Sequence, residues 1–154
     1  PDIVFGGGIT FEDQIFKALA LGSPYVKAVG MARSPLASAM VGKTIGSRIT
    51  DGQIPVYVER FGTSREEIFV TAPELKKRFG SRFAELPSGA IGVYTYFKRL
   101  SQGLRQLMAR ERKFTLDYVT RDDIAALTKD ASDISGIPYI TDIDKDEVTK
   151  ILTS

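Results

Sequence analysis

The residues best suited to chemistry near the start of the chain are three consecutive glycines, Gly6-Gly7-Gly8. They follow a short apolar run, Ile3-Val4-Phe5, which is typical of a parallel strand buried on both faces. Because glycine has no side chain, the backbone N–H groups of such a turn can approach a phosphate closely and donate several hydrogen bonds to it. Glycines also form tight turns that bind nothing, so this turn alone leaves both interpretations open.

A second turn of the same kind follows at Gly30-Met31. It ends a second apolar run and precedes Arg33 and Ser34-Pro35, a capping residue and a proline that predict the start of a helix. The Arg33 guanidinium could pair with phosphate oxygens as a fork. In β/α barrels the loops after strands seven and eight, with the start of a small extra helix, commonly form a phosphate site. Together the two turns predict such a site, with these candidate residues: Gly6, Gly7, Gly8, Gly30, Met31 and Arg33.

Other chemistry is excluded or set aside. Gly42-Lys43-Thr44 ends like a phosphate-binding P-loop, but Ala37 stands where that motif requires its first glycine, and no strand directly precedes it. The chain has no cysteine and no histidine. It therefore cannot form a disulfide, hold an iron–sulfur cluster, build a thiolate zinc site or supply a Ser-His-Asp triad. No metal site is predicted, and catalytic residues stay unassigned.

The charge balance gives no indication of a polyanionic partner. The 21 basic and 19 acidic residues leave a net charge of +2, so neither nucleic acid nor an anionic membrane is an expected partner. The longest apolar stretches fall short of the roughly 20 residues that a membrane span requires, and nothing resembles a signal peptide. A cytoplasmic protein is the default expectation.

The elements expected around these motifs divide the chain near residue 50. Residues 1–50 alternate strand, helix, strand and helix with short connections, as a parallel α/β fold requires, and residues 51–154 are mainly helical. In the first part we expect a strand at Ile3–Phe5, a helix capped by Thr10 and ending at Gly22, a strand at Tyr25–Val29 and a short helix from Ser34-Pro35 toward Gly42. In the second part we expect an extended segment at Ile54–Val58, a helix opened by Ser64 with Glu67, and a helix opened by Pro73-Glu74 that ends at Gly80. A long helix at about Ser88–Arg112, a helix from Thr120 with Asp123 through Ile134 to Gly136, and a last short helix at Asp144–Leu152 complete the chain.

The predicted fold is α/β, the C-terminal segment (last two β/α units) of a TIM barrel over residues 1–50, followed by a mainly helical tail over 51–154 that packs on the barrel. A complete barrel takes about 250 residues, more than the 154 here. We therefore expect a fragment or a split protein whose partner is the missing N-terminal barrel portion, from the same gene product or a separate subunit. A homo-oligomer is a further possibility.

Longer segments resemble known families. The stretch from Gly6 to Asp13, then Lys17–Gly22 and on to Gly30, resembles the end of FMN-dependent barrels such as glutamate synthase, the 2-hydroxy-acid oxidases and type 2 isopentenyl diphosphate isomerase; IMP dehydrogenase shares the pattern. The later segments are similar to the tail of glutamate synthase-related FMN-binding proteins: Ile54–Gly62, Gly89–Phe97 and Leu104–Met108.

The resemblance implies that FMN is the cofactor and that Gly7, Gly8, Gly30 and Met31 bind its phosphate through backbone N–H groups. Gly6 stands where many relatives have Asp, and Thr10 stands where many have Arg. Glutamate synthases hold a 3Fe–4S cluster on three cysteines, which this chain lacks.

The implied function is the FMN-phosphate-binding segment of a glutamate synthase-like oxidoreductase of amino-nitrogen metabolism, which needs the N-terminal barrel portion for activity. Two alternatives stay open. One is a non-catalytic subunit for phosphate-ligand binding or assembly. The other is an IMP dehydrogenase-like nucleotide-binding barrel, which the tail from Ile54 onward does not suit.

Overall fold

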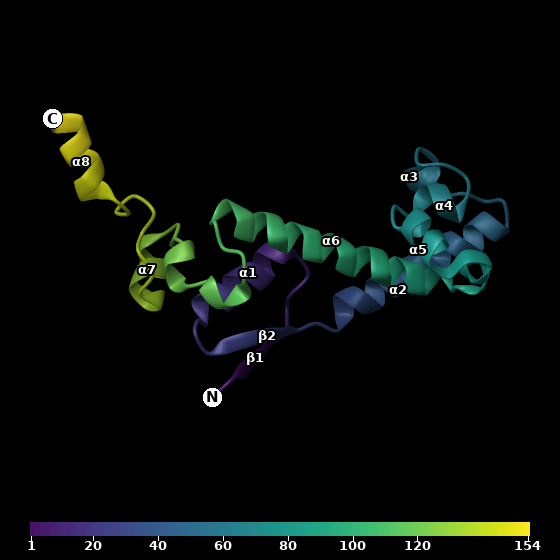
Figure 1. The fold of residues 1–154 in the computed structure, drawn as a ribbon, viewed down its shortest axis with the longest axis horizontal. Helices are drawn as coiled ribbons and strands as arrows, with labels where there is room; N and C mark the ends of the chain where they lie inside the picture. Colours follow the sequence, from purple (N-terminus) through teal and green to yellow (C-terminus); the bar gives the residue numbers. More distant parts are fainter.

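The computed structural model describes all residues from Pro1 to Ser154. It has a mixed α/β fold with two parallel strands near the N-terminus and helices through the rest of the chain (Figure 1). The predicted α/β class is confirmed at this level. In chain order the elements are β1 (Ile3–Gly6), α1 (Glu12–Leu21), β2 (Val26–Gly30), α2 (Arg33–Thr50), α3 (Val56–Glu59), α4 (Arg65–Ile68), α5 (Ala72–Phe79), the 3-10 helix η1 (Gly80–Glu85), α6 (Ser88–Arg110), the 3-10 helices η2 (Leu116–Tyr118) and η3 (Arg121–Asp123), α7 (Lys129–Ser135) and α8 (Lys145–Thr153).

The strands β1 and β2 form a parallel pair connected through α1. Gly6 pairs with Gly30, so the two strands end at the same edge of the sheet. The helix α1 buries Ile15, Phe16, Leu19 and Ala20, as its apolar spacing predicts, and it ends at Gly22 as expected. The expectation that β1 is buried on both faces is wrong for this chain. All four β1 residues are exposed, because the sheet has only two strands.

The longest helices, α2 and α6, pack tightly against each other. Figure 1 shows α6 running across both α1 and α2, so it joins the strand end of the molecule to the far helical lobe. The helix α2 was expected to stop near Gly42 but continues to Thr50. Gly42 is buried against α6, where a side chain would collide with backbone atoms of Ser88 and Gly92. This glycine therefore allows close helix packing and does not end the helix.

The segment from α3 to η1 forms a helical lobe beside the ends of α2 and α6. Its core joins residues of both long helices to residues of the lobe: Ile45, Val58, Phe69, Ala72, Leu75, Phe83 and Ile91. The extended segment expected at Ile54–Val58 is wrong in part. The carbonyl oxygen of Pro55 accepts hydrogen bonds from the N–H groups of Val58 and Glu59, which closes the short helix α3.

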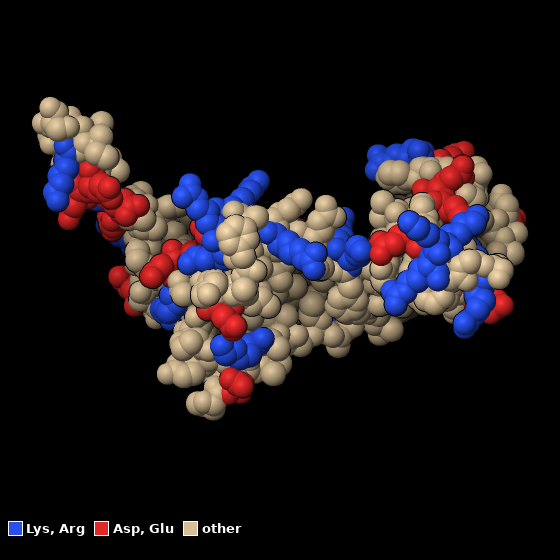
Figure 2. Space-filling view, in the orientation of Figure 1, with Lys and Arg blue, Asp and Glu red and all other residues tan.

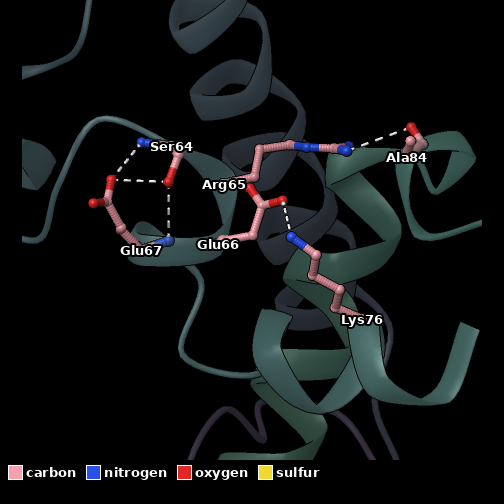
Figure 3. Close-up of polar contacts among 6 residues, drawn as sticks. All are labelled: Ser64, Arg65, Glu66, Glu67, Lys76 and Ala84. Carbon is pink, nitrogen blue, oxygen red and sulfur yellow. Dashed lines mark hydrogen bonds and ion pairs between the residues drawn. The ribbon is translucent and has the colours of Figure 1, made fainter. Parts of the chain in front are cut away.

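The capping box predicted at Ser64 and Glu67 is confirmed (Figure 3). Glu67 Oε2 accepts from the backbone N–H groups of Thr63 and Ser64, at 2.8 and 2.9 Å, and from the Ser64 hydroxyl at 2.8 Å. Arg65 then reaches η1 and the residue after it: Nη1 donates to the carbonyl oxygen of Leu86 at 2.9 Å, and the guanidinium lies over the ring of Phe83 in η1. These contacts attach the one-turn helix α4 to the core of the lobe.

The C-terminal segment departs from one expected helix. Thr120 and Asp123 do form a capping pair, but it opens only the 3-10 turn η3. Ala126 then exchanges backbone hydrogen bonds with Pro138 and Ile140, and this pairing interrupts the helix before α7 begins. The last helix, expected at Asp144–Leu152, is confirmed as α8, which projects from the body of the molecule (Figure 1). No helix has both the length and the apolar character that are needed to cross a membrane.

Candidate functional site

The two glycine turns and the start of α2 meet around one open hollow of about 760 Å³. The pairing of Gly6 with Gly30 places both turns at the same edge of the sheet. All six residues proposed from the sequence line this hollow. The lining also includes residues that were not proposed for the site from the sequence: Ile9, Thr10, Ala32, Ser34, Ala37 and Tyr96.

The first turn has a backbone conformation that favours glycine. Gly7 and Gly8 have φ angles of 108° and 70°, which side-chain-bearing residues rarely adopt. The N–H of Gly7 donates to the carbonyl oxygen of Gly30 at 3.5 Å and so connects the first turn to the second. A side-chain carbon built on any of the three glycines meets no protein atom within 4 Å. The glycines therefore leave open space at the hollow for a ligand.

Several residues that line the hollow have backbone N–H groups with no hydrogen-bond partner in the chain. No hydrogen bond within the protein starts from these N–H groups: Gly8, Ile9, Met31, Ala32, Arg33 and Ser34. The N–H groups of Arg33 and Ser34 belong to the first turn of α2, an 18-residue helix whose N-terminus carries partial positive charge. This arrangement can bind an anion with several acceptor oxygens, such as a phosphate monoester.

Arg33 adds a full positive charge beside these N–H groups. It lies at the start of α2, lines the hollow and is exposed. Its guanidinium takes part in none of the five ion pairs of the chain. The side chain is therefore available to pair with a bound phosphate in a forked geometry.

Three side chains hold the exit of the first turn in place. The Ser34 hydroxyl lies 2.9 Å from the Thr10 hydroxyl and donates to the carbonyl oxygen of Ile9 at 3.1 Å. Gln14 Oε1 accepts from the N–H groups of Thr10 and Phe11, at 2.7 and 3.0 Å. The Tyr96 hydroxyl donates to the carbonyl oxygen of Thr10 at 2.6 Å. The turn is thus held by α2, α1 and α6 together.

These bonds correct two expected helix caps. Thr10 and Ser34 were expected to cap α1 and α2, but the cap positions are Phe11 and Ala32. The two hydroxyls bond to each other and hold the glycine turn instead. The sequence gives no signal for Tyr96 as a site residue, because it lies 86 positions from Thr10.

The hollow is suited to binding more than to acid–base chemistry. Its only titratable side chains are those of Arg33 and Tyr96. The clear pKa shifts occur elsewhere: a hydrogen bond from Lys17 lowers the pKa of Asp13, and one from the Tyr94 hydroxyl lowers the pKa of Glu74. Neither carboxylate lines the hollow.

Comparison with known proteins adds no relative to this picture, because no family model, curated protein or solved structure matches the chain.

Proposed function

We propose that this chain is the FMN-phosphate-binding segment of a glutamate synthase-like oxidoreductase, and that its first 50 residues are the last two β/α units of a TIM barrel. The observation that carries the proposal is the meeting of two glycine turns and the N-terminus of α2 at one hollow. This is the arrangement by which β/α barrels bind phosphate after their last two strands.

The chemistry of the lining fits the phosphate end of FMN. A phosphate monoester has terminal oxygens that accept hydrogen bonds from N–H groups, and its negative charge is favoured by Arg33 and by the N-terminus of α2. When bound, FMN supplies the redox step. The residues of this chain hold its phosphate, and the contacts with the flavin ring and the substrate belong to an N-terminal barrel portion.

A second candidate function is a non-catalytic subunit that binds a phosphate ligand or serves assembly. It is favoured by the lining of the hollow, which offers groups that can bind a phosphate and no carboxylate. Both candidates require phosphate binding, but only the first requires turnover.

Flavin retention tests the shared part of the proposal. The chain is mixed with an N-terminal barrel portion, then with FMN or with riboflavin, which lacks the phosphate, and retained flavin is measured after gel filtration. We expect FMN to be retained and riboflavin to be lost. Failure to retain FMN under every mixing condition overturns the proposal. Turnover of the FMN-loaded protein with an electron donor then supports the oxidoreductase, whereas retention without turnover supports the non-catalytic subunit.

A further inference from the structure

Tyr96 connects the helical tail to the first glycine turn. It lies on α6, and its hydroxyl donates to the carbonyl oxygen of Thr10 at 2.6 Å. One helical turn further on, Leu100 is buried in a cluster that contains Ile9, Ile15 and Leu19. The same side of α6 therefore fixes both the polar backbone of Thr10 and the apolar side chain of Ile9.

The bonds around Tyr96 leave two kinds of backbone group in the turn. The carbonyl oxygens of Ile9 and Thr10 accept hydrogen bonds from Ser34 and Tyr96. The N–H groups of Thr10 and Phe11 donate to Gln14. The N–H groups of Gly8 and Ile9 immediately before them stay without a partner in the chain. These side chains thus hold the end of the turn and leave the N–H groups of Gly8 and Ile9 available to a ligand.

We propose that Tyr96 is a positioning residue for the phosphate: its hydroxyl, bonded to Thr10, holds the N–H groups of Gly8 and Ile9 where they meet the phosphate, together with the start of α2. The inference rests on the proposed function. It assigns to the helical tail a direct part in the site, because Tyr96 is separated by 86 positions from the residue that it holds. Holding donors in place before binding increases affinity, because the turn loses less freedom when the ligand arrives.

Tyr96→Phe tests this role, since it removes one hydroxyl and keeps the ring that packs edge-on against Phe97. Dissociation constants for FMN and riboflavin are measured by flavin fluorescence on the assembled protein, wild type and variant. We expect FMN binding to weaken about three- to tenfold, the effect of losing one hydrogen bond. Riboflavin binding is expected to stay unchanged, because it has no phosphate; a general loss of structure would weaken both flavins.

Tyr94→Phe is the matched control. It removes a hydroxyl from the same helix, one that donates to Glu74 Oε1 at 2.7 Å and lies outside the hollow. We expect it to leave the preference for FMN over riboflavin unchanged. A second variant, Ser34→Ala, removes another bond to the turn and is expected to reduce the preference in the same direction as Tyr96→Phe.

Hydrogen exchange on the flavin-free protein gives a second measurement. Tyr96→Phe is expected to speed exchange of the amides of Thr10 and Phe11, while Tyr94→Phe leaves it unchanged. If the wild type prefers FMN and Tyr96→Phe keeps that preference in full, with unchanged hydrogen exchange, this inference is overturned and the proposed function stands. A wild type that binds FMN no better than riboflavin overturns both.

Discussion

At the scale of single residues, Gly6 and Gly8 belong to one turn, but the structure gives glycine a different role at each position. Gly8 has a φ of 70°, so a side chain there is strained whether or not a ligand binds. Gly6 does not have a positive φ, and a side-chain carbon there meets no protein atom within 4 Å. The fold therefore tolerates alanine at Gly6.

The variant Gly6→Ala separates binding from folding. We expect its melting temperature to match that of the wild type, because its methyl group contacts nothing in the chain. We expect FMN affinity to fall about tenfold or more, since backbone donors lose their close approach to the phosphate. Fluorescence titration with FMN and thermal melting measure the two effects.

Gly8→Ala serves as the contrasting variant. It is expected to lower both the FMN affinity and the free energy of unfolding, the latter by about 1–2 kcal/mol from backbone strain. Unchanged FMN affinity in Gly6→Ala would show that the phosphate does not bind against Gly6.

Glu67 gives the capping box a dependence on pH. Its pKa is lowered below the ordinary value of 4.5, first by the N–H of Thr63 and then by the hydroxyl and N–H of Ser64. Because the pKa is lowered in the folded state, the stabilisation is complete above pH 4.5 and is lost as the pH falls through the lowered pKa. The variant Glu67→Gln has no charge to lose. The difference in free energy of unfolding between wild type and Glu67→Gln, measured in urea, is therefore expected to shrink between pH 7 and pH 3.

Glu66→Gln is the control for this titration, because the neighbouring carboxylate makes an ion pair with Lys76 at 3.5 Å and caps no helix (Figure 3). At pH 7 it is expected to lower the free energy of unfolding less than Glu67→Gln does, because an exposed ion pair contributes little. An equal change in both variants would contradict the role given to the Glu67 hydrogen bonds.

At the scale of elements, the packing of α2 on α6 depends on glycines that permit backbone contact. A methyl carbon on Gly42 would lie 2.7 Å from the carbonyl oxygen of Ser88, and one on Gly92 would lie 2.6 Å from that of Ser38. Backbone atoms in packed helices cannot move aside singly. The two helices must therefore separate to accept either side chain.

Gly42→Ala is expected to reduce the free energy of unfolding by about 1–3 kcal/mol through overpacking, although alanine is the better helix former. Gly103→Ala on α6 makes the same change where the nearest atoms belong to the flexible side chain of Glu12, and it is expected to be neutral or stabilising. Urea unfolding of both variants checks the pair. A stabilised Gly42→Ala would show that the helices do not approach this closely.

These elements show which features local sequence can predict. Apolar runs ended by glycine predicted β1, α1 and β2, and Ser64 with Glu67 marked the start of α4 correctly, because each signal acts within a few residues. The same signals misled where distant contacts decide. Gly42 resembles a helix stop in the local sequence, but it is a glycine that lets α6 pack closely. The hydroxyls of Thr10 and Ser34 bond to each other beside the hollow instead of capping helices.

The candidate site divides in the same way. Both glycine turns and Arg33 could be identified from the sequence, because they directly follow strands or begin a helix. That they share one hollow depends on the register of β1 with β2. The contact of Tyr96 with Thr10 depends on the path of α6, which no local pattern specifies.

At the scale of the whole molecule, the strands form an apolar surface that the chain does not cover. Val4 and Phe5 of β1 are 67% and 49% exposed, and the two-stranded sheet has unpaired edges on both sides. The helix α2 adds Leu36, Met40 and Val41, all more than half exposed. Figure 2 shows charged side chains along α6 and over the α3–η1 lobe, with an uncharged stretch of surface below α6, where α2 runs from the strands toward the lobe. Exposed edges and apolar faces of this kind are typical of surfaces that bind a partner.

We therefore expect the chain alone to self-associate and an N-terminal barrel portion to convert it into one defined complex. Val4→Lys places a charge on the exposed strand and is expected to reduce both kinds of association. Val70→Lys is the matched control, because Val70 is 81% exposed in the helical lobe, away from the sheet.

Native mass spectrometry and light scattering across a concentration series measure the species present. A monomer of 16.9 kDa at every concentration, with a cooperative melt and no binding to the barrel portion, would contradict the assignment of β1 and β2 as barrel strands. If Val4→Lys reduces association and Val70→Lys does not, the interface lies on the sheet, as the proposed barrel predicts.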